Sequence, residues 1–455
     1  MPASAPGSRT GRRWLLRAAA LVVVLALGEL TAFAVLSVRA GEVVTFGVLD
    51  AQRDEVVGAA SGAVAGLPEP AAEAIGPERL RAYQALHPFT GYVRDPSDFP
   101  VALGTDPVAA EYGFPRNHAS PFSAAGDDDV VIAITGGSVA SAFAEHGGPV
   151  LVERLAAVER FRGRSLTVLN LALTGYKQPQ QLMVLNWFLS LGAEIDVVVN
   201  LDGFNELALP IAENLPHGVF PFFPRGWQFR VGHLSAELRE RIGELAVLHD
   251  ERAARAEWFG RAPLRYSMIA ALVWQSLDRR SAARIAALAL EHGPDPADPT
   301  AEYQAHGPRF EPADDAELMD RLVGFWLRCS LQMERLCQGL GIEYYHVLQP
   351  NQYLRGSKRL TPQERSTAFQ ANHPYRPAVV HGYPRLIAAG RVLQSLGVSF
   401  HDLTRVYAEV DETVYADTCC HLNERGHRLL AEAVAAVVAE GTGLPSYEVA
   451  TWRRR

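Results

Sequence analysis

The chain is poor in cysteine, with four in 455 residues, and this excludes a fold held together by disulfide bonds. Cys329 and Cys337 are eight positions apart on an expected helix, or about 12 Å along its axis, which is too far for a disulfide between them. Cys419 and Cys420 are adjacent; packing thiols are the simplest interpretation, and a link to Cys329 or Cys337 is the alternative. No CxxC pair and no histidine at ligand spacing is present, so we expect no zinc site.

An excess of positive charge is also missing. The 43 Lys and Arg residues are scattered and are outnumbered by 51 Asp and Glu residues, which gives a net charge of -8. The sequence has no basic stripe and no aromatic-basic ladder, so we expect no nucleic-acid partner. It has no internal repeat either, and its length suffices for one large domain or two medium ones.

The N-terminus carries a long apolar run. Four arginines between residues 9 and 17 precede Ala18–Val38, a stretch of 21 residues in which Glu29 is the only charged residue. At 1.5 Å per residue, this stretch spans a hydrocarbon core of ~30 Å. The arginines predict that residues 1–17 form a cytoplasmic basic tail and that the bulk of the chain lies outside. A cleaved signal peptide is the alternative, but the run is longer than a usual signal core, so we expect a single-pass signal-anchor in the cell membrane.

Composition divides the rest of the chain. Residues 39–80 are rich in Ala, Gly, Pro and Glu, and we interpret them as a stalk of short helices. Residues 81–445 are expected to form the folded domain. Between about residues 208 and 314 the alternation of strands and helices stops, and an aromatic, proline-rich segment at 217–229 leads into long helical stretches. We expect a helical insertion over the carboxyl edge of a sheet, since surface insertions of this length are usually lids or partner-binding surfaces.

Apolar runs predict that sheet. Val130–Ile134 has five apolar residues without alternation, as is typical of a parallel strand covered on both faces. Further strands are expected at residues 165–173, 194–207, 342–348 and 398–403, with helical segments between them. This alternation predicts an α/β fold of three layers around a doubly wound parallel sheet.

Five residues that could take part in catalysis lie in the loops that follow the expected strands. Ser138 ends the turn TGGS after the first strand, Gly175 follows the second strand, and Asn205 follows the third within GFNE. Asp417 and His421 lie in the loop before the last helix. Ligands of open α/β sheets bind at the carboxyl ends of the strands, so we expect these residues to meet there.

In this order and context, the motifs resemble those of the SGNH (GDSL-like) hydrolase family over roughly residues 133–439, with the helical segment inserted in the middle. The resemblance implies a flavodoxin-like SGNH hydrolase fold, with Ser138, His421 and Asp417 as the catalytic residues. It also implies an oxyanion hole formed by the backbone N–H groups of Ser138 and Gly175 and the side-chain amide of Asn205. It implies neither a metal nor an organic cofactor.

The residue types fit these roles physically. A serine hydroxyl is a poor nucleophile until an imidazole accepts its proton, and a carboxylate behind the imidazole fixes its tautomer. Attack on an ester places negative charge on the carbonyl oxygen, which preorganised N–H donors stabilise. We also expect the missing Cβ of Gly175 to let the oxyanion approach the backbone closely.

The chain departs from the family pattern in three motifs. The serine motif reads TGGS where many members have GDS, and GFNE has Glu206 where Asp is usual. The late motif DTCCH places Asp417 four residues before His421, where three is usual.

Structural interpretations compete with the catalytic ones. Ser138 fits a helix N-cap, Asn205 fits a turn, and His421 fits the entry to a helix. TGGS as a phosphate-binding loop is weaker, because it lacks a third glycine in register and a Lys-Ser/Thr pair.

The expected function is that of a membrane-anchored, outward-facing serine esterase or O-acyltransferase. Its substrate would be an acylated small molecule or glycan, with O-acetylated envelope glycans as a candidate. The alternative is a catalytically silent relative that binds or scaffolds envelope-polysaccharide machinery, suggested by the motif departures and by the aromatic segment at 217–229. A nucleotide-binding α/β protein is a third, weaker hypothesis. The sequence identifies no protein partner.

Overall fold

The computed structural model describes residues 9–40, 43–61, 84–95, 106–115, 117, 120–122, 126, 128–231, 236–290 and 299–441. The chain forms two compact units. One unit consists of residues 1–64 and 239–291, and the other of residues 65–238 and 292–455. The structure therefore divides the chain differently from the expected order of anchor, stalk and single domain, because the inserted helices group with the N-terminal ones. Residues 1–8 of the basic tail and 62–80 of the stalk lie outside the described residues.

The larger unit is built on a parallel sheet of five strands, and the α/β prediction is confirmed. The strands lie in the order β4-β3-β5-β6-β7. The first strand of the sheet, β3, lies next to the edge strand β4, and the later strands are added on the other side of β3. This is the 2-1-3-4-5 order of a doubly wound sheet. β5 is buried along its whole length and β3 along most of it, which explains their uninterrupted apolar runs. The strands are β3 (Asp129–Gly136), β4 (Ser165–Asn170), β5 (Val197–Asp202), β6 (Glu343–Leu348) and β7 (Ser399–Asp402).

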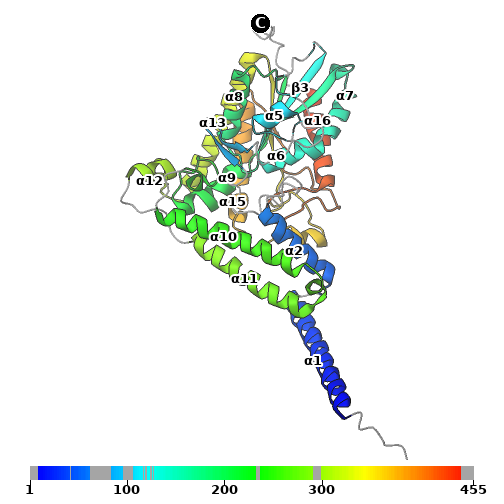
Figure 1. Ribbon diagram of the computed structural model, residues 1–455. Helices are drawn as coiled ribbons and strands as arrows, with labels where there is room; N and C mark the ends of the chain where they lie inside the picture. The colour runs from blue at the N-terminus through cyan, green and yellow to red at the C-terminus, as the bar shows by residue number, and fades with distance from the viewer. Residues whose placement is uncertain are drawn as a thin grey trace, which may run out of the picture. The chain divides into compact units, whose positions relative to one another are not determined.

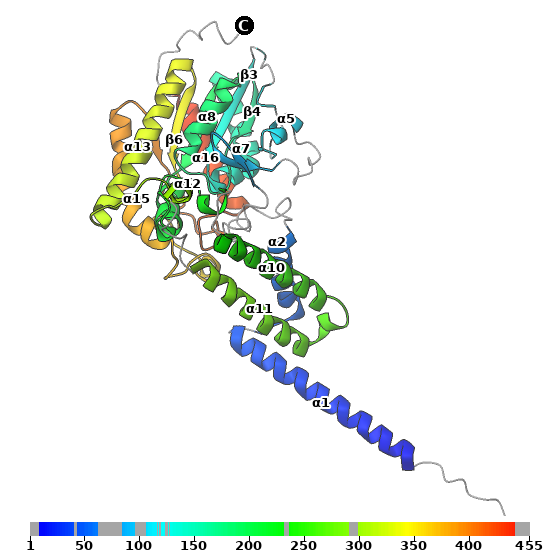
Figure 2. The same cartoon turned by 60° about the vertical axis from the view of Figure 1, so that its left-hand side comes forward.

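Helices cover both faces of this sheet (Figures 1 and 2). One face is covered by α7 (Gly148–Ala156) and α16 (Glu424–Glu440), which pack against each other. The other is covered by α8 (Gln180–Ser190), α13 (Asp315–Leu340) and α15 (Arg376–Ser395). Short helices lie in the connections: α5 (Pro107–Glu111), α6 (Ser138–Ala142), α9 (Asn205–Leu209), α12 (Pro299–His306) and α14 (Pro362–Thr367).

The register brings the strand ends to one edge. Gly136 at the end of β3 pairs with Leu201 of β5, and Leu201 pairs with Val347 of β6. The segments that leave these strands therefore start side by side. Two of the catalytic candidates, Ser138 and Asn205, are the first residues of α6 and α9, which begin at this edge.

A small antiparallel hairpin was not predicted. β1 (Gln84–His87) and β2 (Gly91–Arg94) pair near the start of the segment expected to form the folded domain, where the sequence analysis expected no strand. The Tyr92 hydroxyl donates to the carbonyl of Thr174 at 2.8 Å, which joins the hairpin to the loop after β4. The hairpin is short and lacks a long alternating pattern, so little in its sequence marked it as a pair of strands.

The other unit is helical. It contains α1 (Arg9–Ala40), α2 (Phe46–Ser61), α10 (Ala236–Phe259) and α11 (Met268–Leu290). α10 and α11 form an antiparallel hairpin, with ion pairs Arg252–Asp278 (2.7 Å) and Arg284–Glu244 (2.8 Å) between them. Within the described residues, one helical segment, Leu16–Ala40, is long and apolar enough to cross a membrane.

Two glycines inside helices provide a matched test of core packing. A Cβ at Gly390 of α15 would lie 2.0 Å from the Phe400 ring, whereas a Cβ at Gly339 of α13 would meet no neighbouring atom within 4 Å. We expect Gly390→Ala to lower the free energy of unfolding by roughly 1–3 kcal/mol through overpacking. Gly339→Ala should raise it by up to about 1 kcal/mol, because alanine favours the helix. Urea unfolding measures both, and equal stabilities would contradict this packing.

Candidate active site

The turn after β3 requires both of its glycines. Gly136 has φ +146°, and a Cβ there would lie 2.2 Å from the carbonyl oxygen of Leu201. A Cβ at Gly137 would lie 2.2 Å from the amide nitrogen of Asn205 and 3.1 Å from the carbonyl oxygen of Tyr176. The two glycines thus let β3 end against β5 and bring the Tyr176 and Asn205 loops against the residue before Ser138. Gly137 is itself the N-cap of α6, so Ser138 is not the cap.

A compact loop carries Asp417 and His421. An isolated antiparallel bridge joins Tyr415 to Leu422, and the N–H of Ala416 donates to the carbonyl of His421 at 2.9 Å. α16 begins directly after this loop, with Asn423 as its N-cap. The loop therefore reverses direction within a few residues, which brings Asp417 back toward His421 despite the four-residue spacing.

The structure brings Ser138, His421 and Asp417 into one chain of hydrogen bonds. His421 Nε2 lies 2.9 Å from Ser138 Oγ, and His421 Nδ1 lies 2.5 Å from Asp417 Oδ2. The Ser138 and His421 side chains are buried, with 1% of their surface exposed, and Asp417 is half-buried. These distances suit proton transfer between a hydroxyl and an imidazole. The catalytic roles of the three residues stay a prediction.

Backbone donors fix the second oxygen of Asp417. Asp417 Oδ1 accepts from the N–H groups of Cys419 (2.9 Å), Cys420 (3.2 Å) and His421 (3.2 Å). Burial acts to raise the pKa of the Asp417 carboxyl, but the His421 ring and these N–H donors outweigh burial and hold the pKa below its usual value. The carboxylate is therefore ionised at neutral pH and is oriented by its own loop.

The oxyanion candidates converge on the same turn. The Asn205 amide donates one hydrogen to the carbonyl of Tyr176 at 2.8 Å and lies against Gly137, next to Ser138. Gly175 has φ +78°, and no acceptor among the described residues is bonded to its N–H. The reason for a glycine at this position differs from the expected one. A Cβ at Gly175 would lie 2.9 Å from both the Tyr92 hydroxyl and the Arg225 side chain, so its Cβ side is filled by protein.

Residues that the sequence analysis did not single out hold the Asp417 loop. Gln352 Nε2 donates to the carbonyls of Asp417 (3.0 Å) and Cys419 (3.2 Å), and the Tyr353 hydroxyl donates to the carbonyl of Thr418 at 2.6 Å. Both residues lie in the polar loop after β6. Nothing in the sequence indicated that these residues would bind the Asp417 loop.

A buried ion pair supports the start of the same loop. Glu364 accepts from the N–H groups of Val414 (2.8 Å) and Tyr415 (3.1 Å), and it pairs with Lys358 at 3.2 Å. Burial acts to raise the pKa of Glu364, but these donors keep it below its usual value. The sequence did contain a signal, since Thr361 and Glu364 form a capping box at the start of α14.

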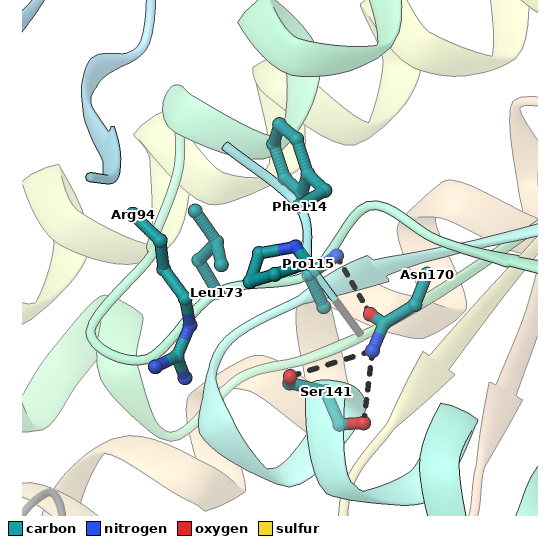
Figure 3. Close-up of a pocket in the computed structure, with 7 residues that line it drawn as sticks. Arg94, Phe114, Pro115, Ser141, Asn170 and Leu173 are labelled. Carbon is teal, nitrogen blue, oxygen red and sulfur yellow. Dashed lines mark hydrogen bonds between the residues drawn. The ribbon is translucent and has the colours of Figure 1, made fainter. Parts of the chain in front are cut away.

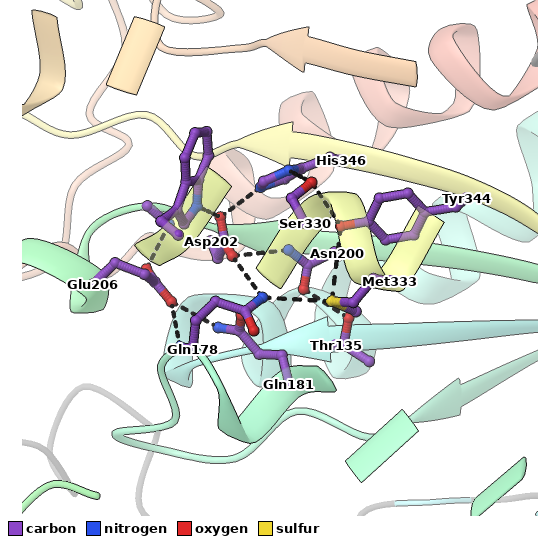
Figure 4. A network of polar contacts seen from close by, with 12 residues as sticks. Thr135, Gln178, Gln181, Asn200, Asp202, Glu206, Ser330, Met333, Tyr344 and His346 are labelled. Atoms are coloured by element: carbon purple, nitrogen blue, oxygen red, sulfur yellow. Dashed lines mark hydrogen bonds and ion pairs between the residues drawn. The ribbon is translucent and has the colours of Figure 1, made fainter. Parts of the chain in front are cut away.

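A network of polar side chains surrounds Asp202 (Figure 4). Asp202 at the end of β5 accepts from Trp326 Nε1 (2.8 Å) and Asn200 Nδ2 (2.8 Å), and it lies 2.8 Å from His346 Nε2. His346 Nδ1 lies 2.6 Å from Ser330 Oγ. This serine, histidine and aspartate resemble a second triad, but all three are buried with at most 2% of their surface exposed. Ser138 and His421 are equally buried, but Ser330 lies in the middle of α13 and His346 inside β6, and neither lies in a loop at the strand ends, so we interpret this set as a structural network.

Glu206 connects this network to the oxyanion loops. Its carboxyl group accepts from the N–H of Gly203 at 2.8 Å. It also accepts from the N–H of Gln178 (3.1 Å) and from Gln181 Nε2 (2.9 Å), which Figure 4 labels. Burial and the nearby Asp202 carboxylate raise the pKa of Glu206 to about 8. Glu206 thus ties the loop after β4 to the turn that carries Asn205.

The aromatic segment at 217–229 belongs to this unit and is fixed to the oxyanion loop. Lys177 Nζ donates to the carbonyls of Pro221 (2.9 Å) and Phe223, and burial lowers the pKa of Lys177 to about 7. Arg225, which covers Gly175, forms a two-point ion pair with Glu213 at 2.8 and 2.9 Å. The segment is therefore part of the site's surroundings and belongs to the same unit as the sheet, whereas α10 and α11 belong mainly to the other unit.

A small cleft lies near the start of α6 (Figure 3). Its lining includes Ser141, one turn after Ser138, and Leu173, two residues before Gly175. Asn170 in its wall donates to the carbonyl of Ser141 at 3.2 Å, so part of the polar lining is already paired. Its other lining residues are Arg94, Phe114, Pro115 and Ala172.

The four cysteines are free thiols. Cys419 Sγ and Cys420 Sγ lie 3.4 Å apart, and with a His421 ring nitrogen they form a group of donor atoms within 4.8 Å of one another. Both ring nitrogens of His421 are already hydrogen-bonded, to Ser138 and to Asp417. A metal bound here would displace one of these bonds, so the group does not fit a resident cofactor of this site. No disulfide joins the pair to Cys329 or Cys337.

Comparisons with known proteins leave the identity of the chain open. No model of a protein family matches the sequence, and no curated protein is significantly similar to it.

His427 predicts a specific pH dependence of stability. Burial, and then the neighbouring His146 and His421, lower the pKa of His427 to about 3 from an ordinary 6.5. Above pH 6.5 this group contributes no pH dependence, because neither state binds the proton. Below it, the unfolded state binds a proton that the folded state does not, so stability falls by up to about 1.4 kcal/mol per pH unit.

We expect His427→Gln to flatten this slope between pH 6 and about 4, measured by urea unfolding at each pH. The matched control is His381→Gln, at an exposed histidine of α15, which should keep the wild-type slope. A His427→Gln slope equal to that of wild type would contradict a neutral, buried His427.

Proposed function

We propose that the protein is a serine esterase or O-acyltransferase of the SGNH type that acts through an acyl-serine intermediate. The observation that carries the proposal is the chain of hydrogen bonds from Ser138 through His421 to Asp417. The strand order of the sheet supports it, because a 2-1-3-4-5 order is that of flavodoxin-like folds, which place ligand sites at the carboxyl ends of the strands. Ser138 is the first residue of α6, which begins at this edge of the sheet.

The geometry supports the following acylation step. His421 Nε2 removes the proton of Ser138 as Oγ attacks the ester carbonyl, and Asp417 stabilises the imidazolium through Nδ1–H. The tetrahedral intermediate collapses when His421 returns the proton to the leaving alcohol. An acyl group then remains on Ser138. Water or a second hydroxyl attacks this ester by the same steps in reverse, which gives hydrolysis or transfer.

The negative charge of the intermediate has donors in place. The Asn205 amide uses one of its two hydrogens on Tyr176, and the Gly175 N–H has no acceptor among the described residues. Together with the backbone N–H of Ser138, these groups would hold the oxyanion. Glu206 and the glycine turn fix the loops that carry them, so the donors are preorganised before substrate binds.

The substrate class follows from the chemistry and from the expected location. An acyl-serine mechanism takes an ester, and an outward-facing enzyme on the membrane meets the acylated molecules of the envelope. O-acetylated envelope glycans are the substrates we favour, with water or a sugar hydroxyl as acceptor. The helical segment Leu16–Ala40 would serve as the anchor.

Labelling by a fluorophosphonate probe tests the nucleophile. We expect the wild-type protein to be labelled and Ser138→Ala to be unlabelled, since the probe reacts with an activated serine. The matched control is Ser141→Ala, one turn further along α6 and equally buried, which should keep the label. In-gel fluorescence reads the result. Equal labelling of wild type and Ser138→Ala would exclude Ser138 as an activated nucleophile and would favour a catalytically silent protein.

Asp417 gives a second test. Asp417→Asn keeps the shape but presents an amide to the imidazole, so the wrong tautomer forms and turnover should fall by roughly 10³- to 10⁴-fold. Hydrolysis of p-nitrophenyl acetate measures it. Asp402→Asn is the control, because this exposed residue after β7 accepts only a local bond from the Thr404 N–H at 3.0 Å and should leave turnover unchanged. Unchanged turnover in Asp417→Asn would remove Asp417 from the mechanism.

A further inference from the structure

The lone charge in the apolar helix has a defined partner. Glu29 of α1 accepts from the Ser267 hydroxyl at 2.6 Å and from the backbone N–H groups of Met268 (2.5 Å) and Ile269 (3.4 Å). Met268 is the first residue of α11, so the Glu29 carboxylate caps the N-terminus of that helix. A carboxylate at a helix N-terminus is stabilised by the exposed N–H groups and by the helix dipole. Glu29 is thus explained by its contact with the α10–α11 hairpin.

Small residues on α1 let α11 approach closely. A Cβ at Gly28 would lie 2.9 Å from the Cδ1 atom of Ile269. One turn and two turns later, Ala32 and Leu36 are buried in a cluster with Met268 and Ala271 of α11. In contrast, the seven residues from Leu21 to Leu27 are all exposed. α1 is therefore exposed over residues 21–27 and packed against α11 from Gly28 onward.

The length of α1 sets the depth of this contact. From Arg17, the last arginine before the apolar run, to Glu29 is twelve residues, or ~18 Å of helix. A hydrocarbon core of ~30 Å would extend about 12 Å beyond that point. If α1 crosses a bilayer, Glu29 and the start of α11 are therefore below the far headgroup region.

The tip of the hairpin has the surface that such a position requires. The tip, residues 258–269, exposes Trp258 and Tyr266 with 55% and 63% of their surface accessible. Trp and Tyr are enriched where a membrane protein meets the headgroups. The charges of the tip are paired locally, since Arg265 bonds to Asp50 of α2 at 2.7 Å and Arg261 lies 3.9 Å from Glu257.

We propose that residues 258–269 insert into the leaflet from which α1 emerges, with Met268 beside Glu29 within its hydrocarbon and the aromatic residues of the tip toward its headgroups. The helical unit is then in contact with the membrane, and is not a water-exposed stalk. Its partner is the lipid interface itself. Because the arginines are already paired, the contact is mainly apolar and aromatic, and it needs no anionic lipid. This proposal is independent of the esterase function, since none of its residues belongs to the site at Ser138.

Spin labels on the full-length protein in lipid nanodiscs test the insertion. Single cysteines are introduced as Tyr266→Cys at the tip and as Val247→Cys, a matched exposed position in the middle of α10. Leu25→Cys, in the exposed part of α1, supplies the bilayer reference. The four native cysteines are buried, and the unsubstituted protein reports any background labelling. Power saturation with oxygen and with a water-soluble nickel chelate reads the depth of each label.

We expect the Tyr266→Cys and Leu25→Cys labels to be at least threefold more accessible to oxygen than to the nickel chelate, and the Val247→Cys label to show the reverse. The result should be the same in purely zwitterionic lipid. A Tyr266→Cys label as exposed to nickel as the Val247→Cys label overturns the insertion. A nickel-accessible Leu25→Cys label overturns both the span and the insertion. If Tyr266→Cys does not fold, as judged by circular dichroism, Trp258→Cys reports on the same tip.

Discussion

The site depends on one imidazole that joins two distant parts of the chain. His421 bonds to Asp417 within its own loop and to Ser138, which lies 283 positions earlier in the sequence. Three backbone N–H groups hold the carboxylate, and Gln352, Tyr353 and Glu364 hold the loop. The ring is therefore placed by many modest bonds, each of which also satisfies a buried polar group that would otherwise cost free energy. The same bonds that stabilise the loop also orient the Asp417 and His421 side chains toward Ser138.

A second set of bonds keeps the opposite wall of the site in place. Glu206 and Lys177 carry ionisable groups into the interior, where burial raises the pKa of the first and lowers that of the second. Both are surrounded by specific partners: N–H donors for the carboxylate and carbonyl oxygens for the amine. Buried groups of this kind are expensive to displace, so they fix the loops around Gly175 and Asn205. The aromatic segment at 217–229 is held as part of this wall.

Individual elements show which parts of the structure could be predicted from the sequence. Val130–Ile134 predicted a buried parallel strand because its apolar run has no alternation, and β3 confirms it. The hairpin of β1 and β2 was missed, because strands of four residues carry almost no periodic signal. The inserted helices were recognised as helical, but their grouping with α1 and α2 depends on contacts such as Glu29 with Met268, between residues 239 positions apart.

The sequence by itself determined the α/β class, the apolar helix and the identity of the polar residues at the strand ends, because these follow from composition and short-range periodicity. Only the tertiary structure decided that a four-residue spacing lets Asp417 reach His421, and that Tyr92 and Arg225 fill the space beside Gly175. It also decided that Glu29 caps a helix from another part of the chain. Such contacts depend on loop conformation and on the register of distant elements, and a local pattern of residues does not encode either of these.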